Sequence, residues 1–305
     1  MEIVNQLTTL KKQYPNITVA LGTFDGIHVG HQRVISRSVD LAGKVAGTSV
    51  VFTFSNHPLS ILAPERCPLQ IITQEEKAVL IKKLGVDILL NIPFTTSLLQ
   101  LSAAQFVDLL LEHLSPKYIL IGPNFFFGHN RCGTPEFLQQ AGLRHGFITE
   151  INPTVYVNDV MVSSTLIRQF IAGGRVDQAA AFLGRTVTMT GKVIHGAKRG
   201  RLLGYPTINL GIEPGLIIPQ DGVYAVKLMI RNQQYNGIAN IGTNPTFNDS
   251  GRRIEVHILN FSGELYGEMV RVFFLKYIRK EATFSGPEEL KRQIMKDLAC
   301  AQDYY

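Results

Sequence analysis

The segment at residues 22–31 places two histidines, His28 and His31, among three glycines, directly after the apolar run 17–21. Glycines let a backbone approach a ligand closely, and the free amide groups at a helix start attract anions. Two imidazoles in the opening turn of the helix that follows add ring donors for the same anion. This pattern predicts a phosphate-handling turn after a β-strand.

A second chemical cluster covers residues 191–204, where glycines are spaced among basic side chains such as Lys198. Backbone amides of such a loop can wrap phosphate while the cations offset its charge, although the same composition is typical of a flexible hairpin. The rigid segment that follows carries Thr207 and Asn209, which point the same way because residues two apart on a strand share a face. Their hydroxyl and amide oxygens could share one Mg²⁺, which accepts oxygen ligands.

Glu255 lies in an alternating segment, residues 253–259, where it shares one face with Arg253 and His257. An exposed polar strand face explains this alternation without any function. The alternative is a general base that takes the proton of a substrate hydroxyl, as phosphoryl transfer to an alcohol requires. Alternation alone favours the exposed face.

Hydroxyl side chains stand at the start of another predicted helix, at Ser163, Ser164 and Thr165, with Arg168 in its first turn. Serine and threonine at a helix start satisfy free backbone amides. An arginine there duplicates the positive end of the helix dipole, which is unfavourable unless an anion binds nearby. The segment therefore fits either a capped helix start or an anion site.

The elements that must position these residues fall into two groups. In the first half of the chain, short apolar runs alternate with segments of helical period, which is typical of a parallel sheet wrapped by helices. Ligands bind such sheets at the carboxyl ends of the strands, and three predicted strands end at Leu21, Phe54 and Ile121. After about residue 185, short alternating strands predict an antiparallel barrel or sandwich, followed by an amphipathic helix at 287–298.

The composition excludes several classes of protein. A chain of 305 residues with 45% hydrophobic content is long enough for two domains, and we expect a boundary near residue 185. The three cysteines form no CxxC pair, so neither a disulfide framework nor a cysteine-rich zinc site is indicated. A formal charge of +6 without a concentrated basic tail does not favour nucleic acid as a partner. We expect a soluble, cytoplasmic protein that does not bind membranes, and the sequence leaves a homo-oligomer open.

Together these residues resemble the bacterial bifunctional riboflavin kinase/FMN adenylyltransferase family, also called prokaryotic FAD synthetase. The resemblance implies an α/β Rossmann-like nucleotidyltransferase domain at residues 1–185, which adenylates FMN with ATP to give FAD and pyrophosphate. It further implies an antiparallel six-stranded β-barrel riboflavin kinase domain with a C-terminal helix at residues 186–305, which phosphorylates riboflavin with ATP to give FMN. The most specific matches are the segments 22–31, 163–168, 191–210, 222–225, 240–246 and 255–257.

The resemblance also implies roles for individual residues. His28 and His31 would stabilise charge as the α-phosphorus of ATP is attacked, and Glu255 would be the base for the ribityl hydroxyl. Thr207 and Asn209 would bind Mg²⁺ and phosphate. The residues expected to bind nucleotide or phosphate are Gly22, Phe24, Gly30, Asn124, Ser164, Thr165, Arg168, Gly191, Lys198, Gly200 and Gly204.

The chain departs from the family pattern in its N-terminal half. Ser55 and Asn56 lie where a carboxylate is common, and Phe126 lies where arginine is frequent. One alternative is therefore a riboflavin kinase whose N-terminal domain only senses nucleotide or flavin, with FMN as the end product. A second is another nucleotidyltransferase with the same histidine motif, acting for instance on a phosphopantetheine-like substrate, with an unrelated binding barrel behind it. Glu255 and the cluster at 191–209 argue against this second alternative.

Overall fold

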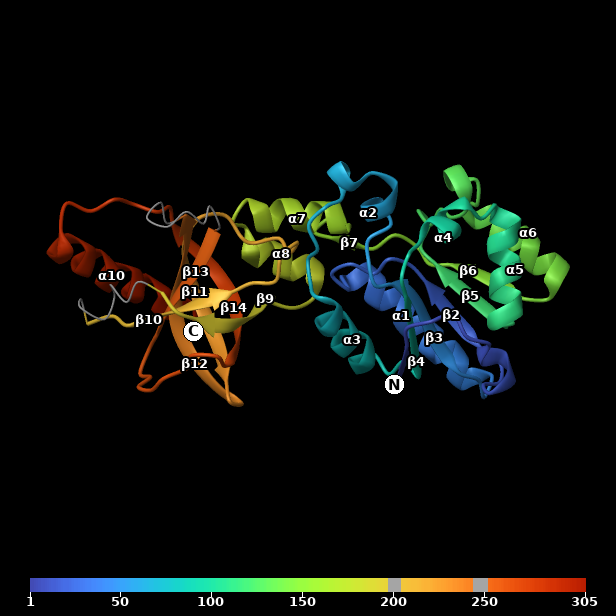
Figure 1. Cartoon of the computed structure of the whole chain (residues 1–305), viewed down its shortest axis with the longest axis horizontal. Helices are drawn as coiled ribbons and strands as arrows, with labels where there is room; N and C mark the ends of the chain where they lie inside the picture. Colours follow the sequence, from blue (N-terminus) through green and yellow to red (C-terminus); the bar gives the residue numbers. More distant parts are fainter. Residues whose placement is uncertain (197–203, 244–251) are drawn as a thin grey trace. The chain divides into compact units, whose positions relative to one another are not determined.

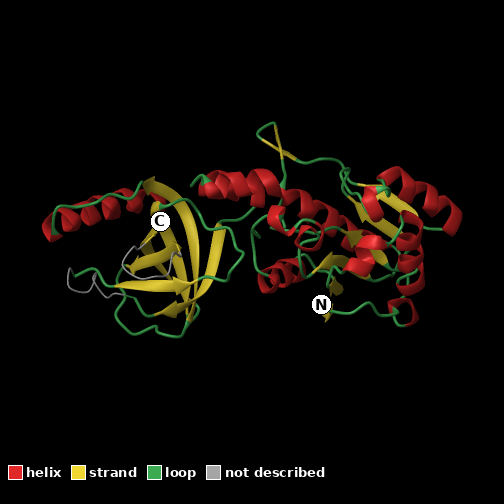
Figure 2. Cartoon of the chain, turned by 45° about the horizontal axis from the view of Figure 1, so that its top comes forward, coloured by secondary structure: helices red, strands yellow, loops and turns green. Residues whose placement is uncertain are grey.

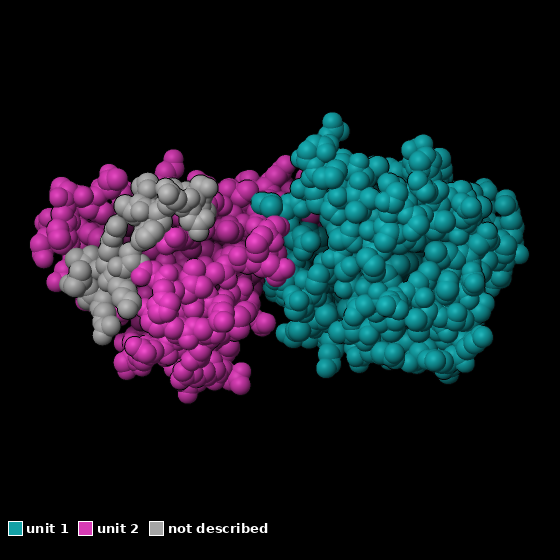
Figure 3. Space-filling view, viewed as in Figure 1, with its two compact units in different colours: residues 1–163 teal, residues 164–305 magenta. Residues whose placement is uncertain are grey.

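The computed structural model of the chain describes residues 1–196, 204–243 and 252–305. The chain divides into two compact units, residues 1–163 and 164–305 (Figure 3). This division groups two helices, α7 (Ser164–Ala172) and α8 (Val176–Leu183), with the second unit. The domain boundary expected near residue 185 stays a prediction.

The first unit is built on a six-stranded parallel sheet with the order β1-β4-β3-β2-β5-β6 (Figure 1). Because β2 has β3 on one side and β5 on the other, the strand order reverses there, and the carboxyl ends of β2 and β5 form a topological switch point. The strands are β1 (Glu2–Val4), β2 (Thr18–Leu21), β3 (Ser49–Phe54), β4 (Ile88–Ile92), β5 (Tyr118–Ile121) and β6 (Ile148–Ile151).

Helices cover both faces of this sheet, which explains why its inner strands are mostly apolar and buried. On one face, Val19 and Ile119 belong to a core completed by residues of α5 and α6. On the other face, the Thr18 hydroxyl donates to the carbonyl oxygen of Ser38 in α1 at 2.8 Å. The helices are α1 (Val29–Lys44), α2 (Leu59–Leu62), α3 (Gln74–Lys83), α4 (Thr96–Gln100), α5 (Ala103–His113) and α6 (Pro135–His145), and a short hairpin follows, β7 (Tyr156–Val157) and β8 (Val160–Met161).

The second unit is a closed antiparallel barrel with the order β10-β13-β12-β11-β14-β9 (Figure 2). Its inward side chains are apolar, and Tyr224 and Phe274 meet edge to face inside it. This confirms the predicted six-stranded barrel. The strands are β9 (Val187–Ile194), β10 (Thr207–Gly211), β11 (Gly222–Ile230), β12 (Gln233–Thr243), β13 (Arg252–Ile258) and β14 (Met269–Arg279).

The C-terminal helix α10 (Pro287–Ala301) packs on the outside of the barrel, as its amphipathic pattern predicts. Ile294 and Leu298 contact the apolar cluster around Val223 of β11. The guanidinium of Arg279 in β14 adds a bidentate pair with the buried carboxylate of Asp297 in the helix, at 2.8 and 2.7 Å. The helix is therefore fixed by both apolar and ionic contacts.

Candidate active sites

The glycine-histidine turn connects the end of β2 to the start of α1, at the switch point of the parallel sheet. His28 is the N-cap of α1, and its Nδ1 accepts a hydrogen bond from the backbone N–H of His31 at 3.2 Å. A neutral His28 therefore carries its proton on Nε2. The two rings stack with centroids 3.5 Å apart and planes 18° from parallel. The structure thus brings the two predicted histidines into direct contact.

The same turn holds strained backbone. Phe24 and Ile27 adopt positive φ angles of 49° and 40°, which are unfavourable for residues with a side chain. Two glycines relieve crowding: a Cβ on Gly22 would lie 2.8 Å from the Phe24 ring, and a Cβ on Gly30 would lie 3.1 Å from the His28 ring. Gly22, Phe24 and Gly30 therefore have a packing role here, and phosphate binding by them stays a prediction.

His31 is poised to remain neutral. Burial lowers its pKa well below 6.5, and the charges of His28 and Lys77 lower it further. The ring lies perpendicular to that of Phe24 in a T-shaped pair, and Nδ1 is buried with no hydrogen-bond partner among the described residues. A neutral imidazole donates one hydrogen bond without carrying a charge. This arrangement suits a donor to a phosphate oxygen.

The lowered pKa of His31 predicts a pH dependence of stability. Below pH 6.5 the His31 ring binds a proton in the unfolded chain but stays unprotonated in the folded protein. The free energy of unfolding therefore falls as the pH falls. We expect a slope from this group of up to about 1.4 kcal/mol per pH unit. Denaturant titrations of the wild type and of His31→Gln measure this slope. They cover pH 7.5 to 5.5, which is roughly the range over which an ordinary histidine titrates. The variant should show the smaller slope, and equal slopes would contradict the prediction.

Residues at the neighbouring strand ends occupy the same carboxyl edge of the sheet. Asn124 follows β5 and is exposed. Asn56, after β3, makes two hydrogen bonds with the backbone of Phe94. Its Oδ1 accepts from the Phe94 amide nitrogen at 2.7 Å, and its Nδ2 donates to the Phe94 carbonyl oxygen at 3.1 Å. Phe126 is 42% exposed, and the guanidinium carbon of Arg131 lies 4.6 Å from its ring centroid. Asn56 therefore links the loops after β3 and β4.

Ser164, Thr165 and Arg168 lie on α7, in the second compact unit. The sequence predicted Arg168 in the first turn of this helix. The helix begins at Ser164, so Arg168 is its fifth residue and lies beyond the first turn. Its charge therefore lies further from the positive helix end than expected. The meeting of these three residues with the histidines stays a prediction.

In the barrel, strand register brings the predicted kinase residues together. Glu255 of β13 is paired with Asn209 of β10 on one side and with Asn240 of β12 on the other. Thr207 is paired with His257 in the same ladder. Directly paired residues point to the same face of a sheet, with Cβ atoms about 5 Å apart. Thr207, Asn209 and Glu255 thus form one polar group on the outer face, because the alternate residues of β13 are buried inside.

Asn209 has the burial and the available oxygen acceptor expected of a metal ligand. It is only 5% exposed, and its Oδ1 is a buried acceptor without a partner in the described part of the chain. Gly196 lies directly over it, since a Cβ there would come within 2.1 Å of Nδ2. The adjoining segment is anchored by His257, whose Nδ1 donates to the carbonyl oxygen of Pro206 at 2.9 Å. A buried orphan amide oxygen beside the hydroxyl residue Thr207 fits a hard cation such as Mg²⁺.

The remaining predicted phosphate ligands are less well defined. Gly191 lies inside β9, where a Cβ would come within 2.6 Å of the Gly211 carbonyl oxygen, so the close approach of β10 already requires glycine. Gly204 has a φ of 82° in an exposed turn. Lys198 and Gly200 lie outside the described residues. Within residues 1–196, 204–243 and 252–305, no group of three His, Cys, Asp or Glu side chains could hold a metal ion.

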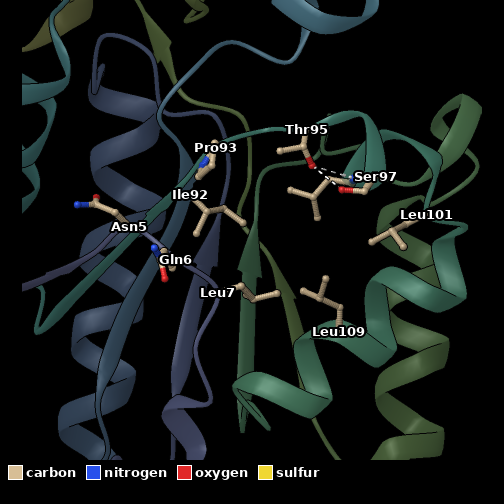
Figure 4. Close-up of a pocket in the computed structure, with 10 residues that line it drawn as sticks. Asn5, Gln6, Leu7, Ile92, Pro93, Thr95, Ser97, Leu101 and Leu109 are labelled. Carbon is tan, nitrogen blue, oxygen red and sulfur yellow. Dashed lines mark hydrogen bonds between the residues drawn. The ribbon is translucent and has the colours of Figure 1, made fainter.

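A cavity of about 410 Å³ lies at the carboxyl ends of β1 and β4, a feature that the sequence did not predict (Figure 4). Its walls are mainly aliphatic, from Leu7, Ile92, Leu98, Leu101 and Leu109. Asn5, Gln6, Thr95 and Ser97 add polar groups, and the Thr95 and Ser97 hydroxyls are hydrogen-bonded to each other at 2.7 Å. The cavity shares the edge of the sheet with the histidine turn, two strands away from β2.

Comparison with known proteins accounts for both units. A family model described as FAD synthetase matches residues 10–166, and one described as riboflavin kinase matches residues 183–305. A bifunctional riboflavin kinase/FMN adenylyltransferase of Buchnera aphidicola is 37% identical over 100% of this chain and 99% of its own length. The chain belongs to the bifunctional riboflavin kinase/FMN adenylyltransferase family. The enzyme of that name from Pseudomonas fluorescens is 36% identical over 99% of this chain and 97% of its own length, and the one from Escherichia coli K12 is 34% identical over 94% and 92%.

A solved structure resembles the whole chain. The crystal structure of a macrolide-efflux protein from Streptococcus pneumoniae matches with a TM-score of 0.90 and 32% sequence identity, over 100% of both chains. Across the described portion of this family member, no helix is both long and apolar enough to cross a membrane. The comparisons confirm the predicted family and its order of two domains.

Proposed function

We propose that this family member makes FAD from riboflavin in two steps. The barrel unit transfers the γ-phosphoryl group of ATP to riboflavin, and the sheet unit then transfers the adenylyl group of a second ATP to the FMN formed. The observation that carries this proposal is that each unit holds its own polar cluster within the range matched by its family model. Kinase and adenylyltransferase domains of this kind use ATP and a divalent metal ion.

In the kinase step, Glu255 accepts the proton of the riboflavin 5′-hydroxyl as its oxygen bonds to the γ-phosphorus of ATP. The bond between that phosphorus and the β,γ-bridging oxygen breaks, and ADP leaves. Asn209 Oδ1 and the Thr207 hydroxyl would hold Mg²⁺, which offsets the phosphate charge. Asn240 lies on the other side of Glu255 in the ladder, and its Nδ2 donates to Oε1 of Glu281 at 3.0 Å.

In the adenylyl step, a phosphate oxygen of FMN attacks the α-phosphorus of ATP, and pyrophosphate leaves. The FMN phosphate is already a nucleophile, so the protein contributes positioning and charge stabilisation. His28 Nε2–H and neutral His31 donate to oxygens that gain charge as the bond to pyrophosphate breaks. Asn124, Ser164, Thr165 and Arg168 are proposed to hold the phosphates.

The proposal is tested by separating riboflavin, FMN and FAD after incubation of the purified protein with ATP, Mg²⁺ and either riboflavin or FMN. FAD from both starting flavins supports the two-step enzyme. FMN accumulation without FAD from either start would support the kinase with a sensing domain. Absence of any flavin turnover would contradict the assignment of function.

The aliphatic cavity offers a site for the isoalloxazine ring of FMN in the adenylyl step. Strands lie about 4.8 Å apart, so the cavity at β4 is about 10 Å along the sheet edge from the turn after β2. The ring is flat and largely apolar, which suits the leucine walls, and the hydroxyl and amide groups at the rim can bind its polar edge. The FMN phosphate would then extend towards His28 and His31.

Filling the cavity should therefore weaken FMN binding selectively. For Leu101→Trp we expect a rise of about tenfold in the KM for FMN in FAD formation, because the indole occupies space that the ring needs. Riboflavin phosphorylation by the barrel should be unchanged. Leu143→Trp is the control, since Leu143 is 89% exposed on α6. An unchanged KM for FMN in folded Leu101→Trp would exclude this cavity as the ring site.

A further inference from the structure

Lys77 is a buried lysine on the first turn of α3. It is only 4% exposed and shares the inner face of the helix with Ile81, four residues later. Its ammonium donates to the carbonyl oxygen of Thr23 at 3.2 Å and to that of Phe54 at 3.1 Å. Thr23 belongs to the glycine-histidine turn and Phe54 ends β3. One side chain therefore links the turn to the adjoining strand.

The surroundings of Lys77 leave its charge largely uncompensated. Both hydrogen-bond acceptors are neutral carbonyl groups, and the Thr23 carbonyl also accepts from the Thr53 hydroxyl at 3.0 Å. The acid whose charge acts on it is Asp25, whose carboxylate accepts from the backbone N–H of Ile71 at 3.1 Å. Burial of an ammonium without a paired carboxylate is costly, so an apolar side chain would suit the fold better. The position of the charge therefore points to a role at the turn.

We propose that Lys77 is a positioning residue for adenylyl transfer, which fixes the histidine turn against β3 and supplies a buried positive charge beside His31. This inference depends on the proposed function of the sheet unit. The charge attracts the polyphosphate of ATP to the turn, in a region where low dielectric strengthens the interaction. It also disfavours a second positive charge on the histidine.

The electrostatic link between Lys77 and the histidine is supported by their titration. Burial lowers the pKa of Lys77 to about 8, and the Asp25 charge acts against this shift, so the ammonium is charged at neutral pH. Its charge contributes to the low pKa of His31. The two hydrogen bonds of Lys77 act only through the position of the turn, whereas its charge also acts on the pKa of His31. The two roles can be separated by measurement.

The test compares Lys77→Met with Lys83→Met in the full-length protein. Methionine keeps an unbranched side chain that is one atom shorter and removes the charge, and loss of a buried charge is compatible with folding. Lys83 is an exposed lysine at the end of the same helix, so its variant makes the same charge change outside the turn. Three quantities are measured: the kcat and KM of FAD formation from FMN, the rate of riboflavin phosphorylation, and the His31 pKa by NMR.

For Lys77→Met we expect kcat of FAD formation to fall about 100-fold, riboflavin phosphorylation to stay unchanged, and the His31 pKa to rise towards 6.5. Lys83→Met should match the wild type in all three quantities. FAD formation within about twofold of the wild type together with an unchanged His31 pKa would overturn the inference. Absence of FAD formation in the wild type would instead overturn the proposed function, while the NMR comparison would still test the link between Lys77 and His31.

Discussion

Replacement of Glu255 by glutamine is expected to lower riboflavin phosphorylation by about 10³-fold and to leave FAD formation from FMN unchanged. Glutamine keeps the shape of the side chain between Asn209 and Asn240 but cannot accept the proton of the ribityl hydroxyl. Because the histidine turn proposed for the second step lies in the other unit, FAD formation from FMN serves as an internal measure of the amount of active enzyme. Initial rates with riboflavin and with FMN, each in excess ATP, give both values.

The control for this prediction is Glu264→Gln, which removes an exposed carboxylate from a loop of the same unit. It should phosphorylate riboflavin at the wild-type rate. If Glu255→Gln also does so, Glu255 is part of an exposed polar strand face and the catalytic interpretation is wrong.

Removal of the His31 ring should produce the converse effect. We expect His31→Ala to lower FAD formation from FMN by about 10² to 10³-fold, because a donor to the developing charge is lost, while riboflavin phosphorylation continues. His28→Ala should have a similar effect, and the double variant should lose less than the product of the two. The rings stack and are linked through the hydrogen bond from His31 N–H to His28 Nδ1, so they act as one unit.

Pyrophosphate release with FMN and ATP measures this step directly. His145→Ala, at the exposed end of α6, is the matched histidine control. Near-normal pyrophosphate release from both single variants and from the double variant would remove the histidine turn from the mechanism.

Much of the fold could be predicted because local periodicity reflects burial. The apolar run before the histidine turn is β2, and the alternating segments after residue 185 became the barrel strands. The strand β1 was missed, since three residues carry no measurable periodicity and β1 exists only through its pairing with β4. The hairpin β7–β8 was also missed, because its strands are two residues long. Asn158 and Asp159 at its turn have the positive φ angles typical of a tight hairpin.

The candidate sites depended more strongly on long-range structure. The sequence predicted that Thr207 and Asn209 share a face, but only the register between β10 and β13 shows that Glu255 lies directly opposite Asn209. Lys77 was missed because a lysine in a charged helix is normally exposed. Its spacing of four residues from the buried Ile81 was the one local signal available.

The most direct test of the central claim is a reaction that starts from riboflavin and uses ATP labelled at either the α- or the γ-phosphorus. Two separate transfers predict FAD that carries the γ-label in its FMN half and the α-label in its AMP half, with free FMN bearing only the γ-label. Formation of γ-labelled FMN without labelled FAD, from an enzyme that also fails to convert added FMN, would contradict the two-step account.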